Sequence, residues 1–380
     1  MRAETVRRLG LWEWVLVAIV LVGTPVAAIR FTQGLGAVTN LTDAYPWGLW
    51  KAFNVVAGIA IGGVGFTTMG LVYVLGVKEF RPLARLALLA AFLAYLGASV
   101  SLVVDIGKPW TIWHPIVMWN PHSVLFEVAW CLMLYTGVLV LEGSAMVFER
   151  LGWDRLVRIQ HAFTVPIVIA GVVLSTLHQS SLGALFLLIP GKLHPIWYTE
   201  ALPLLFFVSA VASGLAMALV LSRLAVRRLG ARIQTAVMTD VARVLSGVLA
   251  VYGVIRLFDL ARRGAHVAAF SLSYESCLFL VEFLLGVVLP VVLLGFRRVR
   301  ETETGLYAAG MLVLFGFVAN RLNVAITGIE AAQGGHYVPA AAETLISLLI
   351  VAVTVLAFNA GVRLLAVLPG RPPAGMADPT

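Results

Sequence analysis

Apolar residues in this chain occur in long, nearly uninterrupted stretches rather than in short alternating runs. About 20 consecutive apolar residues suffice for one helix to cross the hydrocarbon core of a bilayer. Ten stretches satisfy this rule, at 11–30, 49–77, 83–105, 122–147, 160–181, 200–226, 241–261, 276–296, 305–322 and 341–366. The pattern therefore predicts an all-α integral membrane protein with about ten transmembrane helices.

The polar connections between these stretches are too short to hold a soluble domain. We therefore expect residues 1–369 to form a single polytopic membrane domain. The Pro- and Gly-rich end of the chain, 370–380, is expected to be a disordered tail.

Carboxylates recur at comparable places in two parts of the chain. Asp105 and Glu127 fall on the third and fourth predicted helices, while Asp259 and Glu282 fall on the seventh and eighth. This recurrence is compatible with two four-helix bundles built as parallel repeats. The repeats would span 11–147 and 160–296, with the helices in 305–366 appended.

Composition supports insertion into a membrane. Hydrophobic residues make up 61% of the chain and charged residues 12%, whereas soluble domains have roughly 45–50% and 25%. The net charge of +8 would suggest nucleic-acid binding in a soluble protein, but here the basic residues lie between apolar stretches. The two cysteines, Cys131 and Cys277, stand alone in apolar segments, so the chain lacks a ligand set for an iron–sulfur cluster.

Lys and Arg are distributed unevenly over the connections. The two termini and the segments 78–85, 148–159, 223–243 and 297–304 carry 19 of the 27 basic residues. By the positive-inside rule, this asymmetry puts both termini in the cytoplasm. The aromatic connections at 31–48, 106–121 and 182–199 are then expected on the outer face of a cytoplasmic membrane.

Three ionisable side chains are expected near that outer face, on three different helices. Asp105 ends the third predicted helix, Glu127 lies about five residues into the fourth, and His178 lies near the outer end of the fifth. Ionisable groups inside a membrane are costly and usually face a bundle interior or a wet cavity. A carboxylate and an imidazole suit a quinone, whose carbonyls take up protons on reduction and whose hydroxyls lose them on oxidation.

Each of these residues also has a purely structural interpretation. Asp105 could cap a loop or pair with Lys108, and His178 could hydrogen-bond to a Ser or Thr of another helix. The tryptophans near the outer face fit an interfacial aromatic belt, although one or two could line a slot for a quinone ring. Lys51 and Asn54, on the first turns of the second helix, are polar enough to face the same cavity.

Two other classes of function remain open from the residues alone. Buried carboxylates and a glycine-rich second helix would also suit a proton-coupled secondary transporter. A b-type cytochrome would need a histidine on each of two helices at one depth, and only His161 and His178 fall within predicted helices, both on the same one. We therefore expect no haem, and the histidines show no metal-ligand spacing.

Several longer motifs resemble the NrfD/HybB family of quinone-reactive membrane subunits, also called the polysulfide-reductase type. They are YPWGLWKAFN followed by GIAIGGVGF, DIGKPW, WNPHSVLFE, LHQSSLG, HPIWYTEALPLLFF and a final ETLIS. Together they cover about 40–365. One departure is that Lys51-Ala52-Phe53-Asn54 stands where the family pattern has I-A-F-D, which weakens any proton step assigned to that acid.

The resemblance implies a membrane subunit of a respiratory oxidoreductase, with menaquinone or ubiquinone as substrate and no haem, flavin or iron–sulfur cluster of its own. It implies an outer-face ferredoxin-type iron–sulfur partner and, through it, a catalytic pair such as a [NiFe] hydrogenase. Such a chain contributes the quinone site but needs its partners for activity. Carried over by motif, the catalytic candidates are Asp105, Glu127 and His178, and the quinone-binding candidates are Trp47, Lys51, Asn54, Trp113, His122 and Gln179.

Overall fold

The structure is a computed structural model that describes residues 10–188, 191–231, 233–365 and 367. Over these ranges all regular structure is helical, and ten helices are long and apolar enough to cross a membrane. This confirms the predicted fold class and the number of spans. The expected tail at 370–380 lies outside the described residues.

The spans follow one another along the chain with short helices between some of them. They are α1 (Leu11–Gln33), η2–α2–α3–η3 (Trp50–Val74), η4–α4 (Lys78–Asp105), α6 (Val124–Leu151), α7 (Asp154–Leu185), α8 (Leu202–Leu229), α9 (Thr235–Arg262), α11–η6–α12 (Tyr274–Gly295), α14–η7–α15 (Glu303–Gln333) and α16 (Ala341–Leu364). The short elements are η1 (Leu35–Ala37), η5 (Pro109–Thr111), α5 (His114–Val117), α10 (His266–Ala269) and α13 (Arg297–Arg300).

Some helices extend beyond the apolar stretches that predicted them. α7 begins at Asp154 rather than near residue 160, so only Gly152 and Trp153 separate it from α6. Gly152 ends α6 in the left-handed conformation (φ 69°), which glycine adopts without steric cost. A count of apolar residues underestimates the length of such a helix, because backbone hydrogen bonds continue the helix through its polar residues.

Four π-helical segments interrupt the spans, and the apolar pattern did not predict them. They are η2 (Trp50–Ala57), η3 (Gly70–Val74), η6 (Leu284–Val288) and η7 (Asn323–Thr327). π-Helical turns are rare and occur frequently at functional sites. η2 is the first element after the connection 38–49.

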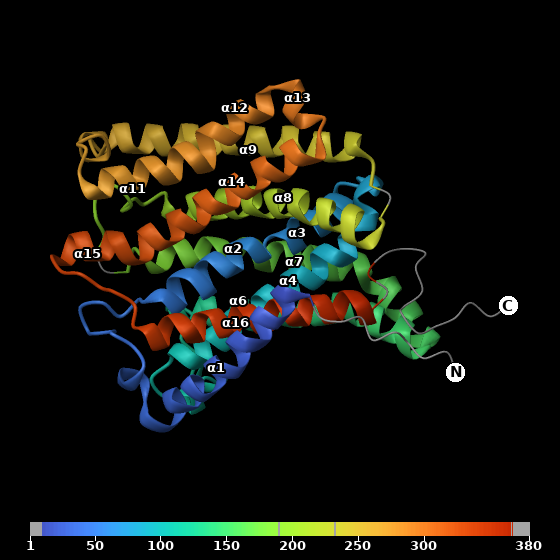
Figure 1. Ribbon diagram of the computed structural model, residues 1–380, viewed down its shortest axis with the longest axis horizontal. Coiled ribbons are helices and arrows are strands. Elements are labelled where there is room, and N and C mark those ends of the chain that lie inside the picture. The colour runs from blue at the N-terminus through green and yellow to red at the C-terminus, as the bar shows by residue number, and fades with distance from the viewer. Residues whose placement is uncertain (1–9, 189–190, 232, 366, 368–380) are drawn as a thin grey trace.

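The long helices run side by side, and α8 lies among the helices of both halves of the chain (Figure 1). It packs on α7, α3 and α2 from the first half and on α9 and α14 from the second. A Cβ added to Gly214 of α8 would lie 2.7 Å from the carbonyl oxygen of Gly63. Only glycine permits so close a backbone approach, which is a common basis of helix packing in membranes.

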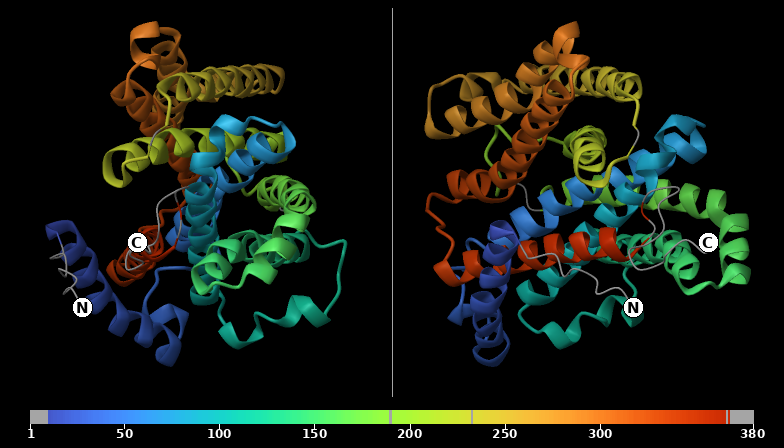
Figure 2. Two further views of the ribbon diagram at one scale, coloured as in Figure 1. Left: turned by 90° about the vertical axis from the view of Figure 1, so that its right-hand side faces the viewer. Right: turned by 45° about the vertical axis from the view of Figure 1, so that its right-hand side comes forward.

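The first and last spans lie together at the periphery, where α1 packs on α16 (Figure 2). α16 also packs on α4, and α14 packs on α8 and η6. In space, α14 therefore belongs with the second half of the chain, while α1 and α16 flank the first. Whether 11–147 and 160–296 are repeats stays a prediction, because contacts between helices do not test it.

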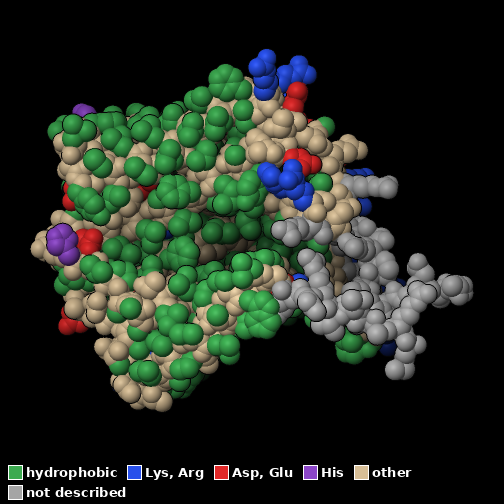
Figure 3. Space-filling view, in the orientation of Figure 1, with side chains coloured by type: hydrophobic (Ala, Val, Ile, Leu, Met, Phe, Trp, Pro, Cys, Tyr) green, Lys and Arg blue, Asp and Glu red, His purple; other side chains and the backbone are tan. Residues whose placement is uncertain are grey.

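Hydrophobic side chains cover most of the molecular face in Figure 3, as a bilayer requires, and the Lys and Arg side chains visible there gather toward one end of the helices. With ten apolar spans, the chain is a multi-pass membrane protein.

Candidate functional site

A pocket of about 200 Å³ opens where several helix ends meet, at the end of the bundle predicted to face outward. Its wall consists of Ala44, Pro46, Trp47, Leu125, Leu185, Phe186, Leu188, Lys192, Leu193 and Ile329. Lys192 is the one charged residue of that wall. A mostly apolar pocket with one polar group is typical of a site for a small, largely apolar molecule.

Residues distant in sequence form this pocket, because the ends of several helices lie close together there. Trp47 precedes η2, Phe186 follows the last residue of α7, and Ile329 comes from α15 (Gly328–Gln333). The rings of Trp47 and Phe186 lie 4.8 Å apart between centroids with a 51° tilt. Trp47 was predicted as a quinone-binding residue, whereas Phe186 and Lys192 were not singled out, because a lone Phe or Lys beside a helix end has no distinctive pattern.

The connection that carries Lys192 is tied to α15. The main-chain N–H of His194 donates to the carbonyl oxygen of Gly328 at 2.8 Å. Burial lowers the pKa of His194, against the opposing charge of Glu275, so the imidazole is neutral near pH 7. The backbone bond keeps the connection that carries Lys192 at the pocket wall. Because the His194 imidazole is neutral, it does not add a second positive charge near Lys192.

Glu127 does not line this pocket but lies two residues after the lining residue Leu125 on α6. It is the fourth residue of α6, hence roughly 4–5 Å below the start of that helix. Its carboxylate Oε1 accepts a hydrogen bond of 2.5 Å from Ser181 Oγ of α7, and the residue is otherwise exposed. Ser181 and Leu185 share one face of α7 at i and i+4, and Leu185 lines the pocket.

His178 continues that face of α7 further inward. It is fully buried, and neither ring nitrogen has a hydrogen-bond partner within the described part of the chain. Its ring packs against Tyr95 of α4, with 5.7 Å between centroids. The sequence predicted both residues near the outer ends of their helices; the structure joins Glu127 to Ser181, whereas His178, three residues earlier on α7, packs on Tyr95.

Asp105 forms an ion pair that the sequence did not anticipate. Its Oδ2 lies 2.9 Å from the ammonium of Lys51, which also donates to the carbonyl oxygen of Pro46 at 2.9 Å. The alternative pairing with Lys108 is therefore wrong, because the first turn of η2, rather than the following loop, faces the end of α4. The Lys51 ammonium also lies 5.6 Å from the Trp47 ring centroid, which links this pair to the pocket wall.

Arg30 of α1 is a buried residue that the sequence analysis missed. Its guanidinium donates to the carbonyl oxygens of Val104 at 2.6 Å and Ile106 at 2.7 Å. Carbonyls at a helix end lack intrahelical partners, so Arg30 caps α4 beside Asp105. In the sequence, an arginine at the end of a span is typical of an ordinary interfacial residue. Nothing in the neighbouring residues predicts that Arg30 is buried.

Of the six predicted quinone-binding residues, five do not line the pocket. Asn54 bonds to Ser347 of α16, and the Gln179 amide donates to the carbonyl oxygen of Ile59 at 3.0 Å inside the bundle. Trp113 and His122 are exposed in the connection between α4 and α6. Apart from Trp47, the predicted residue nearest to the pocket is Lys51, through its contact with the Trp47 ring.

A second buried polar cluster surrounds Glu282 of α11 in the other half of the chain. Its carboxylate accepts hydrogen bonds from Trp197 Nε1 at 3.1 Å, Asn320 Nδ2 at 2.9 Å and Asn323 Nδ2 at 2.6 Å. Arg256 donates to the carbonyl oxygen of Ile196 at 2.9 Å. These bonds tie the connection before α8 to α9, α11 and α14.

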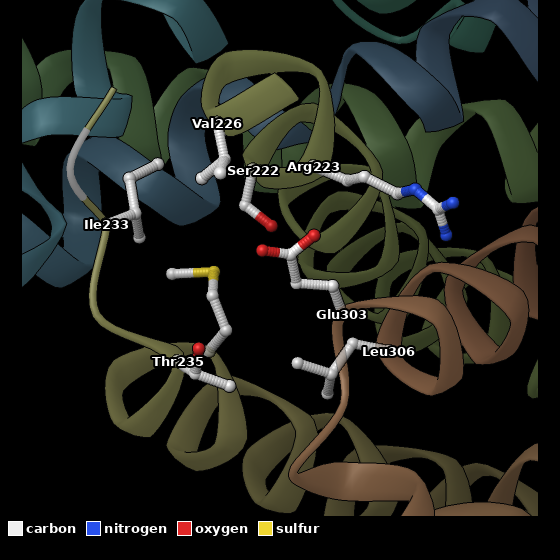
Figure 4. A pocket seen from close by; sticks show the side chains of 8 residues that line it. Ser222, Arg223, Val226, Ile233, Thr235, Glu303 and Leu306 are labelled. Atoms are coloured by element: carbon white, nitrogen blue, oxygen red, sulfur yellow. The ribbon is translucent and has the colours of Figure 1, made fainter. Parts of the chain in front are cut away.

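Another pocket lies at the opposite end of the bundle, between α8, the start of α9 and α14 (Figure 4). Its volume is about 20 Å³, which suits a water molecule but not a ring system. Glu303 points into it toward Ser222, while Arg223 extends away (Figure 4). Of these two pockets, the one beside Trp47 has the larger volume and is the candidate for a quinone-sized ligand.

These features define a multi-pass membrane protein with an apolar pocket and an adjacent carboxylate at one membrane face. The family model described as "Polysulphide reductase, NrfD" matches residues 37–332. The chain belongs to the NrfD family.

Three relatives illustrate the range of similarity. A protein of Nitratidesulfovibrio vulgaris (Hildenborough), whose name assigns no activity, is 36% identical, with 82% of each chain covered. The "Probable Ni/Fe-hydrogenase 2 b-type cytochrome subunit" of Escherichia coli K12 is 32% identical over 90% of this chain and 88% of the relative. The "Menaquinone reductase, integral membrane subunit" of N. vulgaris is 29% identical over the same shares.

The term b-type cytochrome in one of those names makes haem a question for this chain too. A haem between two helices needs a histidine on each at matching depth. His161 and His178 both lie on α7, 17 residues and about 25 Å apart along its axis. The other five histidines lie outside the spans. The residues present therefore do not fit a bis-histidine haem.

We accordingly expect the purified chain to show no cytochrome absorption. A dithionite-reduced minus oxidised spectrum should lack the α-band of a b-type haem, because no two spans offer paired imidazoles. A haem band that scales with protein concentration, and that disappears in a His178→Ala variant, would contradict this expectation.

Proposed function

We propose that this chain exchanges electrons between the membrane quinone pool and an iron–sulfur protein bound at its outer face. The observation that carries the proposal is the apolar pocket between Trp47 and Phe186, with Glu127 two residues after its lining residue Leu125 on α6. The name of the menaquinone reductase relative supports quinone as the substrate class. Electron carriers would lie in the partner, since Cys131 and Cys277 are on different spans.

In this proposal each side chain has a defined task. The rings of Trp47 and Phe186 hold the quinone ring, and the Lys192 ammonium donates a hydrogen bond to one carbonyl oxygen. Glu127 exchanges protons with the ring oxygens. Oxidation of one quinol would deliver two electrons to the partner and two protons to the outer side, and reduction would take up the same numbers.

Among possible partners, we propose a catalytic pair of the [NiFe] hydrogenase type joined through a ferredoxin-type iron–sulfur subunit. The hydrogenase relative covers 90% of this chain and supports this choice over the other complexes of the family. Purification in a mild detergent, followed by mass spectrometry of the co-purifying subunits, tests it directly. A partner set without a hydrogenase large subunit would reassign the chain to another quinone-linked complex, and isolation without any iron–sulfur protein would favour a transporter.

We also propose that the pocket faces outward and both termini lie in the cytoplasm, because Lys and Arg concentrate in the alternate connections. In a background with Cys131→Ala and Cys277→Ala, a membrane-impermeant maleimide should label Trp110→Cys in intact cells. It should label Arg298→Cys only after lysis. The reverse pattern would contradict this orientation.

A further inference from the structure

The last span makes a set of hydrogen bonds to the segment that enters η2. The carboxylate Oε1 of Glu343, in the first turn of α16, accepts from the main-chain N–H of Leu49 at 3.0 Å. The same N–H lies 3.1 Å from the Tyr337 hydroxyl, which itself donates to Glu343. The indole N–H of Trp50 donates to the carbonyl oxygen of Glu343 at 2.9 Å. Three groups near the start of α16 thus hold two consecutive residues.

These bonds replace partners that the helix itself cannot supply. Leu49 immediately precedes η2, and the first N–H groups of a helix have no acceptor within it. Leaving such a donor unpaired in a buried place destabilises the folded chain. Glu343 and Trp50 are both fully buried, so water is a poor substitute here. The junction therefore depends on α16 for its hydrogen bonds.

Gly48 shows how closely the two segments approach. A Cβ at this position would lie 2.5 Å from the Tyr337 hydroxyl and 2.6 Å from Glu343 Oε1. Any other residue would displace the side chains that bind Leu49. The sequence Pro46-Trp47-Gly48 therefore places a glycine where the last span must come close.

The contact continues on both sides of Leu49. One turn further along α16, Ser347 donates to Asn54, whose amide lies 3.3 Å from the Ser347 carbonyl oxygen. On the other side, the Asn40 amide donates to the carbonyl oxygen of Val338 at 2.9 Å. Segment 337–347 thus follows the chain from residue 40 to residue 54. We call 337–347 the clamp segment.

Leu49 lies midway between two residues of the candidate site. Trp47, two residues earlier, lines the pocket, and Lys51, two residues later, pairs with Asp105. A shift of Leu49 would move both side chains, and a displacement of about 1 Å can strongly weaken a binding site. Burial and the bond to Glu343 raise the pKa of Tyr337 well above its usual range, so its hydroxyl remains a donor.

We propose that Glu343 is a positioning residue that, together with Tyr337, holds residues 46–51 in the conformation that binds quinone. The inference rests on the proposed quinone site. Glu343 acts through Leu49 and does not touch the ligand. α16 lies beyond residues 37–332, which the family model matches, and Glu343 is the first residue of the ETLIS motif noted in the sequence.

The test uses the full chain purified in detergent and the quinone analogue HQNO, a 4-hydroxyquinoline N-oxide whose fluorescence is quenched on binding. Glu343→Ala should weaken HQNO binding about tenfold. Glu343→Gln keeps the oxygen that accepts from Leu49 and should restore affinity to within about twofold of the original protein. In membranes containing the partner subunits, Glu343→Ala should raise KM for quinone and leave kcat nearly unchanged.

Thr354→Ala provides a matched control on the same helix, because the Thr354 hydroxyl bonds only to the carbonyl oxygen of Ile350 in the described structure. It should bind HQNO like the original protein. As an independent measurement, hydrogen–deuterium exchange of the Leu49 amide should accelerate in Glu343→Ala and remain slow in Thr354→Ala.

Three outcomes overturn the inference, in distinguishable ways. If the original protein binds HQNO and Glu343→Ala binds it equally well, the positioning role is wrong while the quinone site stands. If Glu343→Gln is as defective as Glu343→Ala, the charge matters rather than the acceptor oxygen, which also contradicts positioning. If the original protein binds no HQNO, the proposed function fails, and the positioning role fails with it.

Discussion

Replacing Glu127 with glutamine is expected to lower quinone-linked electron transfer about 100-fold, the smaller end of the range for losing a positioned acid–base group. The amide keeps the size of the carboxyl group and can still accept from Ser181, whose Oγ lies 2.5 Å from Glu127 Oε1. It cannot take up the proton that a quinol hydroxyl releases. The rate should be measured in membranes with a quinol analogue and the native partner complex.

The matched control is Glu303→Gln, the same chemical change at the opposite end of the bundle. Glu303 pairs with Arg227 at 3.3 Å in an exposed position, where an ion pair contributes at most about 1 kcal/mol. This variant should retain its rate. A Glu127→Gln protein that assembles normally and turns over at the original rate would remove Glu127 from the proton step.

Trp47→Ala should raise KM for quinone about tenfold or more and change kcat less. The Trp47 ring forms one wall of the pocket, packs on Phe186 at 4.8 Å and carries the Lys51 ammonium on its face. Its loss removes apolar area and an aromatic partner, and such contacts are worth about 1–3 kcal/mol each. Steady-state kinetics with a series of quinone concentrations separates KM from kcat.

Trp153→Ala is the control for this prediction, since Trp153 is half-exposed at the other end of the bundle and packs only on Phe148 among aromatic residues of the described chain. It should leave both kinetic constants near their original values. If Trp47→Ala keeps its KM, or loses kcat with KM unchanged, Trp47 does not form the binding surface and the pocket assignment is wrong.

The spans could be predicted from sequence because bilayer thickness fixes the length of an apolar helix. All ten predicted stretches coincide with spans, and Glu127 lies in the first turn of α6, close to the predicted start of that helix. Helix ends were less accurate, as the start of α7 at Asp154 shows. The π-helical segments were missed, since their hydrogen-bond register depends on tertiary contacts rather than on composition.

The site itself was only partly predictable. Trp47 was found because an aromatic motif marks it, while the ion pair of Lys51 with Asp105 required knowing which turn of η2 faces α4. Arg30 and Glu343 come from α1 and α16, the two spans furthest apart in sequence, which meet at the periphery of the bundle. No local pattern indicates that a terminal helix packs against a site more than 290 residues away.

The central claim is that quinone binds in the pocket between Trp47 and Phe186. It is tested most directly by irradiating the membrane-embedded complex with a menaquinone analogue that carries a photoreactive azide on its ring. Mapping the labelled peptides should find the label within residues 44–47 and 185–193, and excess menaquinone should suppress it. Label confined to other segments, or label that menaquinone does not displace, would contradict the claim.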